Sequence, residues 1–536
     1  MNNVNVIGAG LAGLSAALAL SKKGVKCNLI SLQPSERAQS VMAEGGINAA
    51  LDTMGEGDVC ENHFQDTVKG GVFLADPDAV RDLVNAAPGI VDMLYKLGVP
   101  FQMENGKIIQ RNFGGQKLKR TAFVKSSTGK VLMTALIDEV RKEEAKGNVV
   151  RFSHHEALCP VISEDECTGV VVKDTFTGEI LTLQGPVIAA TGGMNGLFEG
   201  MTTGSTANGG DFTAACFDMG VEMGNPEMIQ FHPTTARIPG KRLLISEAAR
   251  GEGGRLFVNR GGRRYYFMEE LFPEAGNLAP RDVISRQMVK VPAESNDEPQ
   301  VYLEMSHLPE KTWKEKLPDM RDEIKSFLGI DPAKMPVPVS PGIHFFMGGL
   351  LTDRYHRTNV NGLYAAGECA CQYHGANRLG GNSMLGAIYG GMVAADSFFS
   401  DTSNGHLNRD LRTAAADSLF KEHTGTVDTG DVSAKFSKTL CDILSAGLGI
   451  IRDEKKMESA LKEIEELKAD SLTPKEHRRT LLGEAMLLCA LQRKESRGAH
   501  TRSDYPERDD ELFQKTSVAV RRGDITEVSL RDLGIL

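Results

Sequence analysis

The first residues whose spacing could support chemistry are the glycines of a short turn near the N-terminus. Gly8, Gly10 and Gly13 form the pattern G-x-G-x-x-G. Its first glycine permits a tight turn, the second lets the backbone approach a pyrophosphate, and the third lets a helix pack closely on a strand. Because 57 of the 536 residues are glycine, this spacing arises by chance on the order of once in such a chain, so the flanking elements must decide.

Those flanking elements are the ones that a dinucleotide-binding unit requires. Residues 4–7 predict a buried strand, residues 11–22 a helix and residues 25–32 a second strand. An acidic residue that would bond a ribose is expected at the end of the second strand, but Ser31 and Gln33 stand there. A serine hydroxyl can still bond a ribose, so the turn predicts a dinucleotide cofactor but not a plain NAD site.

Two later segments have the same character. Residues 187–190 and 362–366 are apolar runs that are each followed by a small-residue turn. This is typical of strands in an open α/β sheet whose ligand lies at their carboxyl ends. Residues 233–343 differ, because they mix short elements with many prolines and the only tryptophan, Trp313. That region is predicted to be an inserted α+β domain.

The last part of the chain is predicted to be helical. A polar linker is expected at residues 401–410, followed by a helix with apolar side chains on one face: Met457, Leu461, Ile464 and Leu467. The apolar residues between 481 and 490 indicate the helix that packs against this face.

Composition argues against several classes of function. The net charge is −10 and the sequence pI is about 5.7, so there is no basic footprint for nucleic acid or an anionic membrane. A small anionic substrate would therefore need a local cluster of positive groups. The nine cysteines are scattered without C-x-x-C or C-x-x-C-H spacing. This argues against an iron–sulfur cluster, a structural zinc or an attached haem, and it favours buried free thiols.

The most apolar run covers residues 4–20. No positive charge precedes it, and no A-x-A cleavage site follows it. It is also shorter than the roughly 20 apolar residues that a bilayer crossing needs. We therefore interpret it as the strand, turn and helix described above, and we expect a cytoplasmic protein.

A series of longer motifs follows the glycine turn in a fixed order. They are Ala43-Glu44-Gly45-Gly46-Ile47-Asn48-Ala49-Ala50, Ala190-Thr191-Gly192-Gly193, Gln230-Phe231-His232-Pro233-Thr234, Ser246-Glu247-Ala248-Ala249-Arg250-Gly251-Glu252-Gly253-Gly254, Ala279-Pro280-Arg281-Asp282, His344-Phe345-Phe346-Met347-Gly348-Gly349, His374-Gly375-Ala376-Asn377-Arg378-Leu379-Gly380-Gly381-Asn382-Ser383 and Glu495-Ser496-Arg497-Gly498-Ala499-His500. From residue 4 to about residue 510, the chain resembles the flavoproteins of the succinate dehydrogenase, fumarate reductase and L-aspartate oxidase family.

The resemblance implies an α/β fold built on a Rossmann-like FAD-binding domain, with an inserted α+β capping domain and a C-terminal helical domain. The expected ranges are 1–232 and 344–400 for FAD binding, 233–343 for the cap, 401–510 for the helical domain and 511–536 for a C-terminal tail. FAD is the expected cofactor, and no metal site is expected.

The same resemblance implies a site for a C4 dicarboxylate. The residues that would hold its two carboxylates are His232, Ser246, His344 and Arg378. Arg281 would donate a proton to the substrate carbon, and Glu247 and Arg250 would relay protons to it. A guanidinium holds its proton tightly, with a pKa above about 12, so it can act as an acid only if a relay replaces the proton at once. Ser246 stands where the family usually has threonine and keeps the hydroxyl.

Cofactor contacts are implied in the same way. They are expected at Gly8, Gly10, Gly13, Ser31, Gln39, Ser40, Gly45, Gly46, Thr191, Gly192, Gly193, Asp211, Glu368, Asn382 and Ser383. Members that attach FAD covalently use a histidine at the position of Gln39. An amide cannot bond the flavin, so FAD is expected to be noncovalent. Covalent attachment is associated with the higher flavin potential that succinate oxidation needs, and its absence favours fumarate reduction.

L-aspartate oxidase is the alternative within the family, because its members also lack that histidine. They carry a glutamate for the substrate ammonium just before a Gly-Gly pair, where this chain has Phe113. Phe113 and Met347 both favour the reductase, and a dehydrogenase of a related dicarboxylate is a further alternative.

Other classes of protein fit less well. A non-catalytic scaffold subunit should have lost Arg281, His344 or Arg378, and none is lost. Without a haem-attachment motif, electrons are expected to come from a partner, most simply a separate iron–sulfur subunit. Any membrane contact would then be peripheral and would occur through partner subunits.

Overall fold

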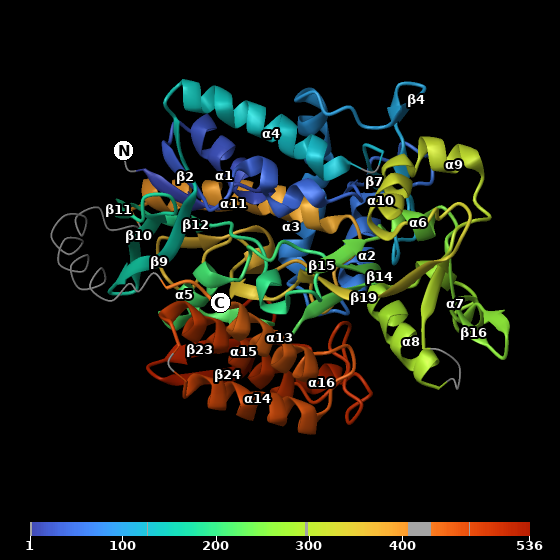
Figure 1. Ribbon diagram of the computed structural model, residues 1–536. Helices are drawn as coiled ribbons and strands as arrows, with labels where there is room; N and C mark the ends of the chain where they lie inside the picture. The colour runs from blue at the N-terminus through green and yellow to red at the C-terminus, as the bar shows by residue number, and fades with distance from the viewer. Residues whose placement is uncertain (1–2, 126, 295–298, 406–429, 471) are drawn as a thin grey trace.

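A five-stranded parallel sheet carries the N-terminal glycine turn, and two of its strands, β2 and β12, are labelled in Figure 1. The computed structural model describes residues 3–125, 127–294, 299–405, 430–470 and 472–536. Five strands in the order β21-β12-β1-β2-β8 make the sheet: β1 (Val4–Ile7), β2 (Cys27–Ser31), β8 (Val149–Ser153), β12 (Val187–Ala189) and β21 (Leu363–Ala365). The strands predicted from the apolar runs are thus confirmed, within one or two residues at their ends.

Long helices cover one face of this sheet (Figure 1). They are α1 (Leu11–Lys22), α3 (Pro77–Lys96), α4 (Thr128–Ala145) and α11 (Asn382–Ser403). α1 has the predicted bounds and contacts both α4 and α11. Side chains such as Val6, Leu14 and Leu29 are fully buried between sheet and helices, so the strand–turn–helix at the N-terminus is held by the largest hydrophobic core.

An antiparallel sheet packs on the opposite face. It consists of β9 (His155–Ser163), β10 (Glu166–Asp174) and β11 (Ile180–Gln184). Val170 and Val172 of β10 share a core with Ile7 and Ile30 of the parallel sheet. Both faces of the parallel sheet are covered, so the residues on both sides of its strands are buried, which explains the continuous apolar runs in the sequence.

The predicted inserted domain is a six-stranded sheet with helices. Its strands are β14 (Ile229–Ile238), β15 (Lys241–Leu244), β16 (Arg255–Arg260), β17 (Arg263–Tyr265), β18 (Val301–Glu304) and β19 (Val337–Phe346). Its helices are α6 (Ala248–Gly251), α7 (Phe267–Leu271), α8 (Arg281–Ala293), α9 (Glu310–Glu315) and α10 (Pro318–Leu328). Trp313 is buried in its core.

The expected ends of this domain, at residues 233 and 343, differ from the strand bounds. β14 begins before His232 and β19 continues past His344, and the two strands pair with each other. Both histidines therefore lie on continuous strands where the cap joins the FAD-binding part, rather than on flexible connections.

The C-terminal region combines helices with a strand pair. The helices are α13 (Ala434–Gly447), α14 (Glu454–Lys468), α15 (Pro474–Gln492) and α16 (Asp510–Phe513). Met457 and Ile464 of α14 are fully buried in the core that α14 shares with α15, as the sequence predicted. Residues 401–403 were expected in a linker but belong to α11, because Asp401 is buried and accepts hydrogen bonds from Arg357 and Tyr364. Residues 406–410 of that linker lie outside the described residues.

Residues 516–531, which were expected in a tail, form two strands instead. β23 (Thr516–Arg522) and β24 (Ile525–Arg531) are the edge of a five-stranded sheet with β13 (Met223–Gly224), β20 (Gly349–Leu351) and β22 (Ala370–Cys371). Beside β13, the buried carboxylate of Glu227 accepts hydrogen bonds from Arg493 and Ser517, each at 2.7 Å. These contacts tie the end of the chain to the segment that leads into β14.

The remaining elements are short or peripheral. They are α2 (Cys60–Gly70), α5 (Asp211–Asp218), β3 (Ile47–Asn48), β4 (Met103–Glu104), β5 (Lys107–Ile108), β6 (Gln110–Arg111) and β7 (Thr121–Ala122). Within the described ranges, no helix combines the length and apolar character that a membrane span requires. All nine cysteines are free thiols, and only Cys60 is not buried.

Candidate active site

A cavity of about 320 Å³ runs between the parallel sheet and the cap. It begins at the glycine turn, where Gly8 adopts φ +110° and a Cβ atom would lie 2.1 Å from the carbonyl oxygen of Ala190. It extends to His232, His344 and Arg378. The cavity therefore joins the predicted cofactor turn to the predicted substrate residues.

Most of the expected cofactor contacts line this cavity. They are Gly8, Gly10, Ser31, Gln39, Ser40, Gly45, Gly46, Thr191, Gly192, Asp211, Glu368 and Ser383. Gly13 lies behind the turn against the carbonyl of Gly8, and Gly193 lies against the carboxylate of Glu368. Asn382 also lies away from the cavity, because its amide bonds Asn48 and Thr67 and so fastens α11 to its neighbours.

Several polar atoms on the cavity wall have no hydrogen-bond partner among the described residues. They include the hydroxyls of Ser31 and Thr191 and one carboxylate oxygen of Glu44. Buried polar atoms are normally satisfied, so orphans on a cavity wall indicate a polar ligand. Together with the bare backbone of the turn at the start of a helix, these atoms fit a dinucleotide such as FAD.

Three of the expected cofactor residues have protein partners of their own. The Gln39 side-chain oxygen accepts the backbone N–H of Ser205 at 2.7 Å. Both oxygens of Asp211 accept hydrogen bonds from Arg479 of α15, at 2.6 and 2.8 Å. Burial raises the pKa of Glu368 to about 7, although hydrogen bonding from the Phe346 N–H opposes the shift. Each of these contacts joins residues that are far apart in the sequence or buried by the fold, so they could not be predicted from local spacing.

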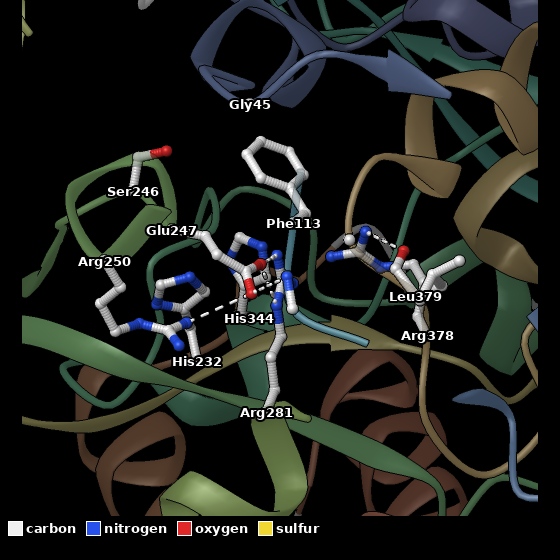
Figure 2. Close-up of polar contacts among 12 residues, drawn as sticks. Gly45, Phe113, His232, Ser246, Glu247, Arg250, Arg281, His344, Arg378 and Leu379 are labelled. Atoms are coloured by element: carbon white, nitrogen blue, oxygen red, sulfur yellow. Dashed lines mark hydrogen bonds and ion pairs between the residues drawn. The ribbon is translucent and has the colours of Figure 1, made fainter. Parts of the chain in front are cut away.

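The residues predicted for proton transfer meet at the other end of the cavity (Figure 2). Oε2 of Glu247 accepts two hydrogen bonds from Arg281, from Nη2 at 2.7 Å and from Nε at 3.1 Å. Oε1 of Glu247 accepts the backbone N–H of Gly114 at 2.9 Å. Burial disfavours the charged form of Glu247, but Arg281 and Arg250 outweigh it and keep the pKa of the carboxyl below its ordinary value.

Arg250 stands behind Glu247 and does not line the cavity. Its Nη2 lies 3.4 Å from Oε1 of Glu247, and its Nη1 donates to the carbonyl of Asn277 at 2.6 Å. Its side chain is fully buried. Arg281, Glu247 and Arg250 therefore form a continuous row of contacting charged groups that leads away from the cavity.

Two histidines face each other beside this row. The rings of His232 and His344 are 5.1 Å apart, and His344 Nδ1 shares a hydrogen bond of 2.8 Å with the Thr203 hydroxyl. Burial lowers the pKa of both histidines well below the ordinary value, and the charge of Arg281 lowers it further. Both imidazoles are therefore neutral near pH 7, and each carries a single N–H whose position depends on its protein partners. His232 Nδ1 faces the Thr234 carbonyl at 3.3 Å, so its N–H lies on that side and its Nε2 can accept.

Arg378 is held on a second side of the cavity. Its guanidinium lies 4.4 Å from the centre of the Phe345 ring, and its Nε has no partner among the described residues. Gln230 fixes the backbone nearby, because its amide nitrogen donates to the carbonyl of Arg378 at 2.8 Å. The same glutamine accepts a hydrogen bond from Nη1 of Arg281 at 3.0 Å, so one amide positions both arginines.

Phe113 and Ser246 complete the wall. Phe113 is buried, and a Cβ on Gly45 would lie 3.0 Å from its ring. The Ser246 hydroxyl accepts the Ala248 N–H at 3.4 Å at the start of α6. Figure 2 shows the Phe113 ring above Glu247 and Arg281, on the side of Gly45.

The loop of Arg497 to His500 contacts Ala376, two residues before Arg378. The Ala499 N–H donates to the carbonyl of Ala376 at 2.9 Å, and Gly498 adopts φ +56° directly against that residue. Sequence reasoning recognised this motif, but the roles of Gln230, Thr203 and the loop were missed, because each arises from contacts between distant segments.

Comparisons with known proteins cover nearly the whole chain. Residues 3–384 match the family described as FAD binding domain, and residues 477–535 match fumarate reductase flavoprotein C-term. The succinate dehydrogenase flavoprotein subunit of Bacillus subtilis is 37% identical over 97% of this chain and 94% of that protein. The fumarate reductase flavoprotein subunit of Helicobacter pylori is 32% identical over 96% of this chain and 82% of that protein. Among solved structures, a mutant quinol fumarate reductase of E. coli has a TM-score of 0.89 at 30% identity, covering 100% of this chain and 97% of that one.

Proposed function

The chain belongs to the succinate dehydrogenase/fumarate reductase family of FAD-dependent flavoproteins, and from this premise we propose that it interconverts fumarate and succinate, with fumarate reduction favoured. One observation carries the proposal. Arg281 and Arg378 lie beside the neutral pair His232 and His344 at one cavity, so two guanidinium groups and two imidazoles surround the place that a dianion would occupy.

FAD, when bound, supplies the hydride for the reduction. The glycine turn, Ser31 and the other residues on the cavity wall would hold it, and Gln39 supports a noncovalent attachment. The residues at the other end of the cavity would bind the dicarboxylate and move its proton.

Arg378 and His344 would bind one carboxylate, and His232 and Ser246 the other. Such contacts draw electron density away from the carbon–carbon double bond of fumarate, which prepares it to accept a hydride. Because the histidines are neutral, the fixed charge comes from the arginines, whose planar forks suit carboxylates.

Arg281 would give its proton to the second carbon of the double bond. One hydride and one proton convert fumarate to succinate, so the step balances. Glu247 is ionised at rest, so it would first take a proton from Arg250 and then pass it to Arg281. Arg250 would then regain a proton from beyond the row. The distances of 2.7 and 3.4 Å along this row support that order of transfer.

The direction of the reaction is proposed from Gln39, whose amide cannot bond FAD covalently. Covalent attachment is associated with the higher flavin potential that succinate oxidation needs, so its absence favours fumarate reduction. Related proteins carry the names of both directions, at 37% and 32% identity, so the names themselves favour neither direction.

Electrons would come from an iron–sulfur partner subunit. The similar proteins are named flavoprotein subunits. In the described parts of this chain, no cluster of three or more histidine, cysteine or acidic side chains could hold a metal. We further propose a cytoplasmic location, with any membrane association made through partner subunits.

The alternative is oxidation of L-aspartate to iminoaspartate. It would need a carboxylate to meet the substrate ammonium, and the buried Phe113 ring stands where that group is expected. This observation favours a dicarboxylate without an amine.

A paired assay tests the proposal. Anaerobic oxidation of reduced viologen with fumarate is measured beside aspartate-dependent peroxide formation in air and dye reduction with succinate, all at known FAD occupancy. Fumarate reduction should be the fastest activity. Robust aspartate oxidation would refute the dicarboxylate assignment, and faster succinate oxidation would refute the direction.

A further inference from the structure

Arg242 on β15 is a buried arginine whose charge has no acidic partner among the described residues. Its side chain lines the main cavity and the residue is only 3% exposed. Nη1 donates to the hydroxyls of Ser340 at 2.6 Å and Thr235 at 3.4 Å, and Nη2 reaches only the sulfur of Met201 at 3.8 Å. Nε is buried without a hydrogen-bond partner, and within the described ranges no carboxylate lies at ion-pair distance.

Several other buried arginines in this chain meet carboxylates. Arg120 contacts Asp58 and Asp66, and Arg493 contacts Glu227 and Glu495. A buried charge without a counter-charge is costly, so its retention on a cavity wall indicates a ligand of opposite sign. Burial lowers the pKa of Arg242 only to about 10, so the group stays charged near neutral pH.

The position of Arg242 is set by the strand that it crosses. Gly342 of β19 leaves the space that the arginine fills, since a Cβ there would lie 2.4 Å from Cδ of Arg242. Gly342 is the register partner of His232 on β14, so the space that Arg242 fills lies beside the strand pair that carries both histidines. Arg242, His232 and His344 all line the main cavity.

Arg242 also lies toward the outer part of the cavity. Its neighbour Lys241 and Glu323 of α10 are both partly exposed and line the same cavity. The glycine turn, where a pyrophosphate would bind, belongs to the parallel sheet, whereas Arg242 and its contacts Thr235 and Ser340 belong to the cap. The position of Arg242 thus suits a small anion that passes between solvent and His344.

We propose that Arg242 is an additional carboxylate-binding residue, which holds one end of the C4 dicarboxylate before it moves inward to Arg378 and after it leaves. The identity of the ligand rests on the proposed function. Such a contact acts on binding of the dicarboxylate and not on the chemical step, so its loss raises KM and leaves kcat nearly unchanged. A charge-assisted hydrogen bond of ordinary strength corresponds to a change in affinity of about ten- to a hundredfold.

The test compares Arg242→Gln with Arg237→Gln in the FAD-loaded protein. Arg237 is the register partner of Arg242 on β14, but it is exposed and lies outside the cavity wall. Both variants therefore lose one positive charge from the same hairpin. Fumarate kinetics give kcat and KM, and titration with malonate, a dicarboxylate that cannot be reduced, gives affinity without turnover. FAD content and thermal unfolding are measured for each variant, and Arg242→Lys tests rescue of the charge.

The expected result is a KM for fumarate and a malonate dissociation constant raised about tenfold or more in Arg242→Gln alone, partly restored in Arg242→Lys. Equal effects in both variants, or unchanged malonate affinity in Arg242→Gln, would overturn the inference. Loss of FAD from Arg242→Gln would assign the arginine to the cofactor and overturn it as well. If the native protein failed to reduce fumarate while malonate binding still depended on Arg242, the anion site would stand and the proposed reaction would fail.

Discussion

Replacement of Arg281 by lysine is expected to remove nearly all turnover while the protein stays folded. The guanidinium donates two hydrogen bonds to Glu247 and one, at 3.0 Å, to Gln230. A lysine has a single nitrogen, so it cannot maintain this fork and also present an N–H to the substrate. Because lysine keeps the positive charge, Glu247 retains a cationic partner and the buried ion pair is not broken.

The size of the loss follows from the role of a general acid. Loss of such a group typically costs about 10²–10⁴ in rate, which is about 2.7–5.5 kcal/mol of activation free energy at about 1.36 kcal/mol per tenfold. The loss should appear in kcat, since Arg281 transfers its proton only in the transition state. KM should change little, because Arg378, His232 and His344 still bind the dianion.

Arg286→Lys is the matched control, since it makes the same change on the same helix. Arg286 pairs with Asp282 at 3.4 Å and lies outside the wall of the main cavity. The assay is viologen oxidation across a range of fumarate concentrations, with FAD content and thermal unfolding measured for both variants. Half of the native kcat in Arg281→Lys would remove Arg281 from proton transfer. A raised KM with native kcat would leave it a binding role only, and equal loss in the control would point to distortion of α8.

Four further predictions test other parts of the site. FAD should be released completely by acid precipitation, because Gln39 cannot bond it; flavin fluorescence that stays with the denatured chain would contradict this. Phe113→Glu should weaken fumarate binding, since two charges about 4 Å apart repel by about 4 kcal/mol at an effective dielectric of 20; unchanged binding, with Phe113→Leu as control, would exclude the residue from the site. Gly498→Ala should raise the KM for fumarate, because its Cβ would lie 2.5 Å from the Ala376 carbonyl; Gly523→Ala, at φ +59° with open space around it, controls for backbone strain, and equal kinetics would refute the effect. Because the Glu368 pKa is raised to about 7, its contribution to stability is full below about pH 4.5 and is lost as pH rises through about 7. Glu368→Gln cannot ionise, so between pH 5 and 9 it should lose up to about 3 kcal/mol less free energy of unfolding than the native protein. Parallel plots of unfolding free energy against pH for the two proteins would contradict this.

Sequence reasoning predicted those parts of the molecule that neighbouring residues determine. The strand, turn and helix around Gly8 follow from local spacing, and α1 has the predicted bounds. The family motifs predicted that Arg281, Glu247 and His344 belong to one site, and all three line the main cavity.

The rest depends on contacts between distant residues. Gln230 lies inside a recognised motif, but its role comes from Arg281 and Arg378, which are 51 and 148 residues away. Asn382 was expected to contact the cofactor, and its side-chain amide bonds Asn48 and Thr67, which lie more than 300 residues earlier. Residues 516–531 carry no signal that would pair them with β13, almost 300 residues earlier, since strand pairing is set by the whole fold.

The pairing of β23 with β13 also bears on how the chain folds during synthesis. The Ser517 N–H donates to Asn225, a residue 292 positions earlier, and Asn225 stands just ahead of the strand that carries His232. At about 5–20 residues per second, roughly 15–60 s separate the emergence of these two residues from the ribosome. Until Arg493 and Ser517 have emerged, Glu227 cannot form the two contacts that hold it beside the strand that carries His232. The substrate end of the cavity should therefore mature last, and a chain that stalls after the FAD-binding part would be a natural target for chaperones and proteases.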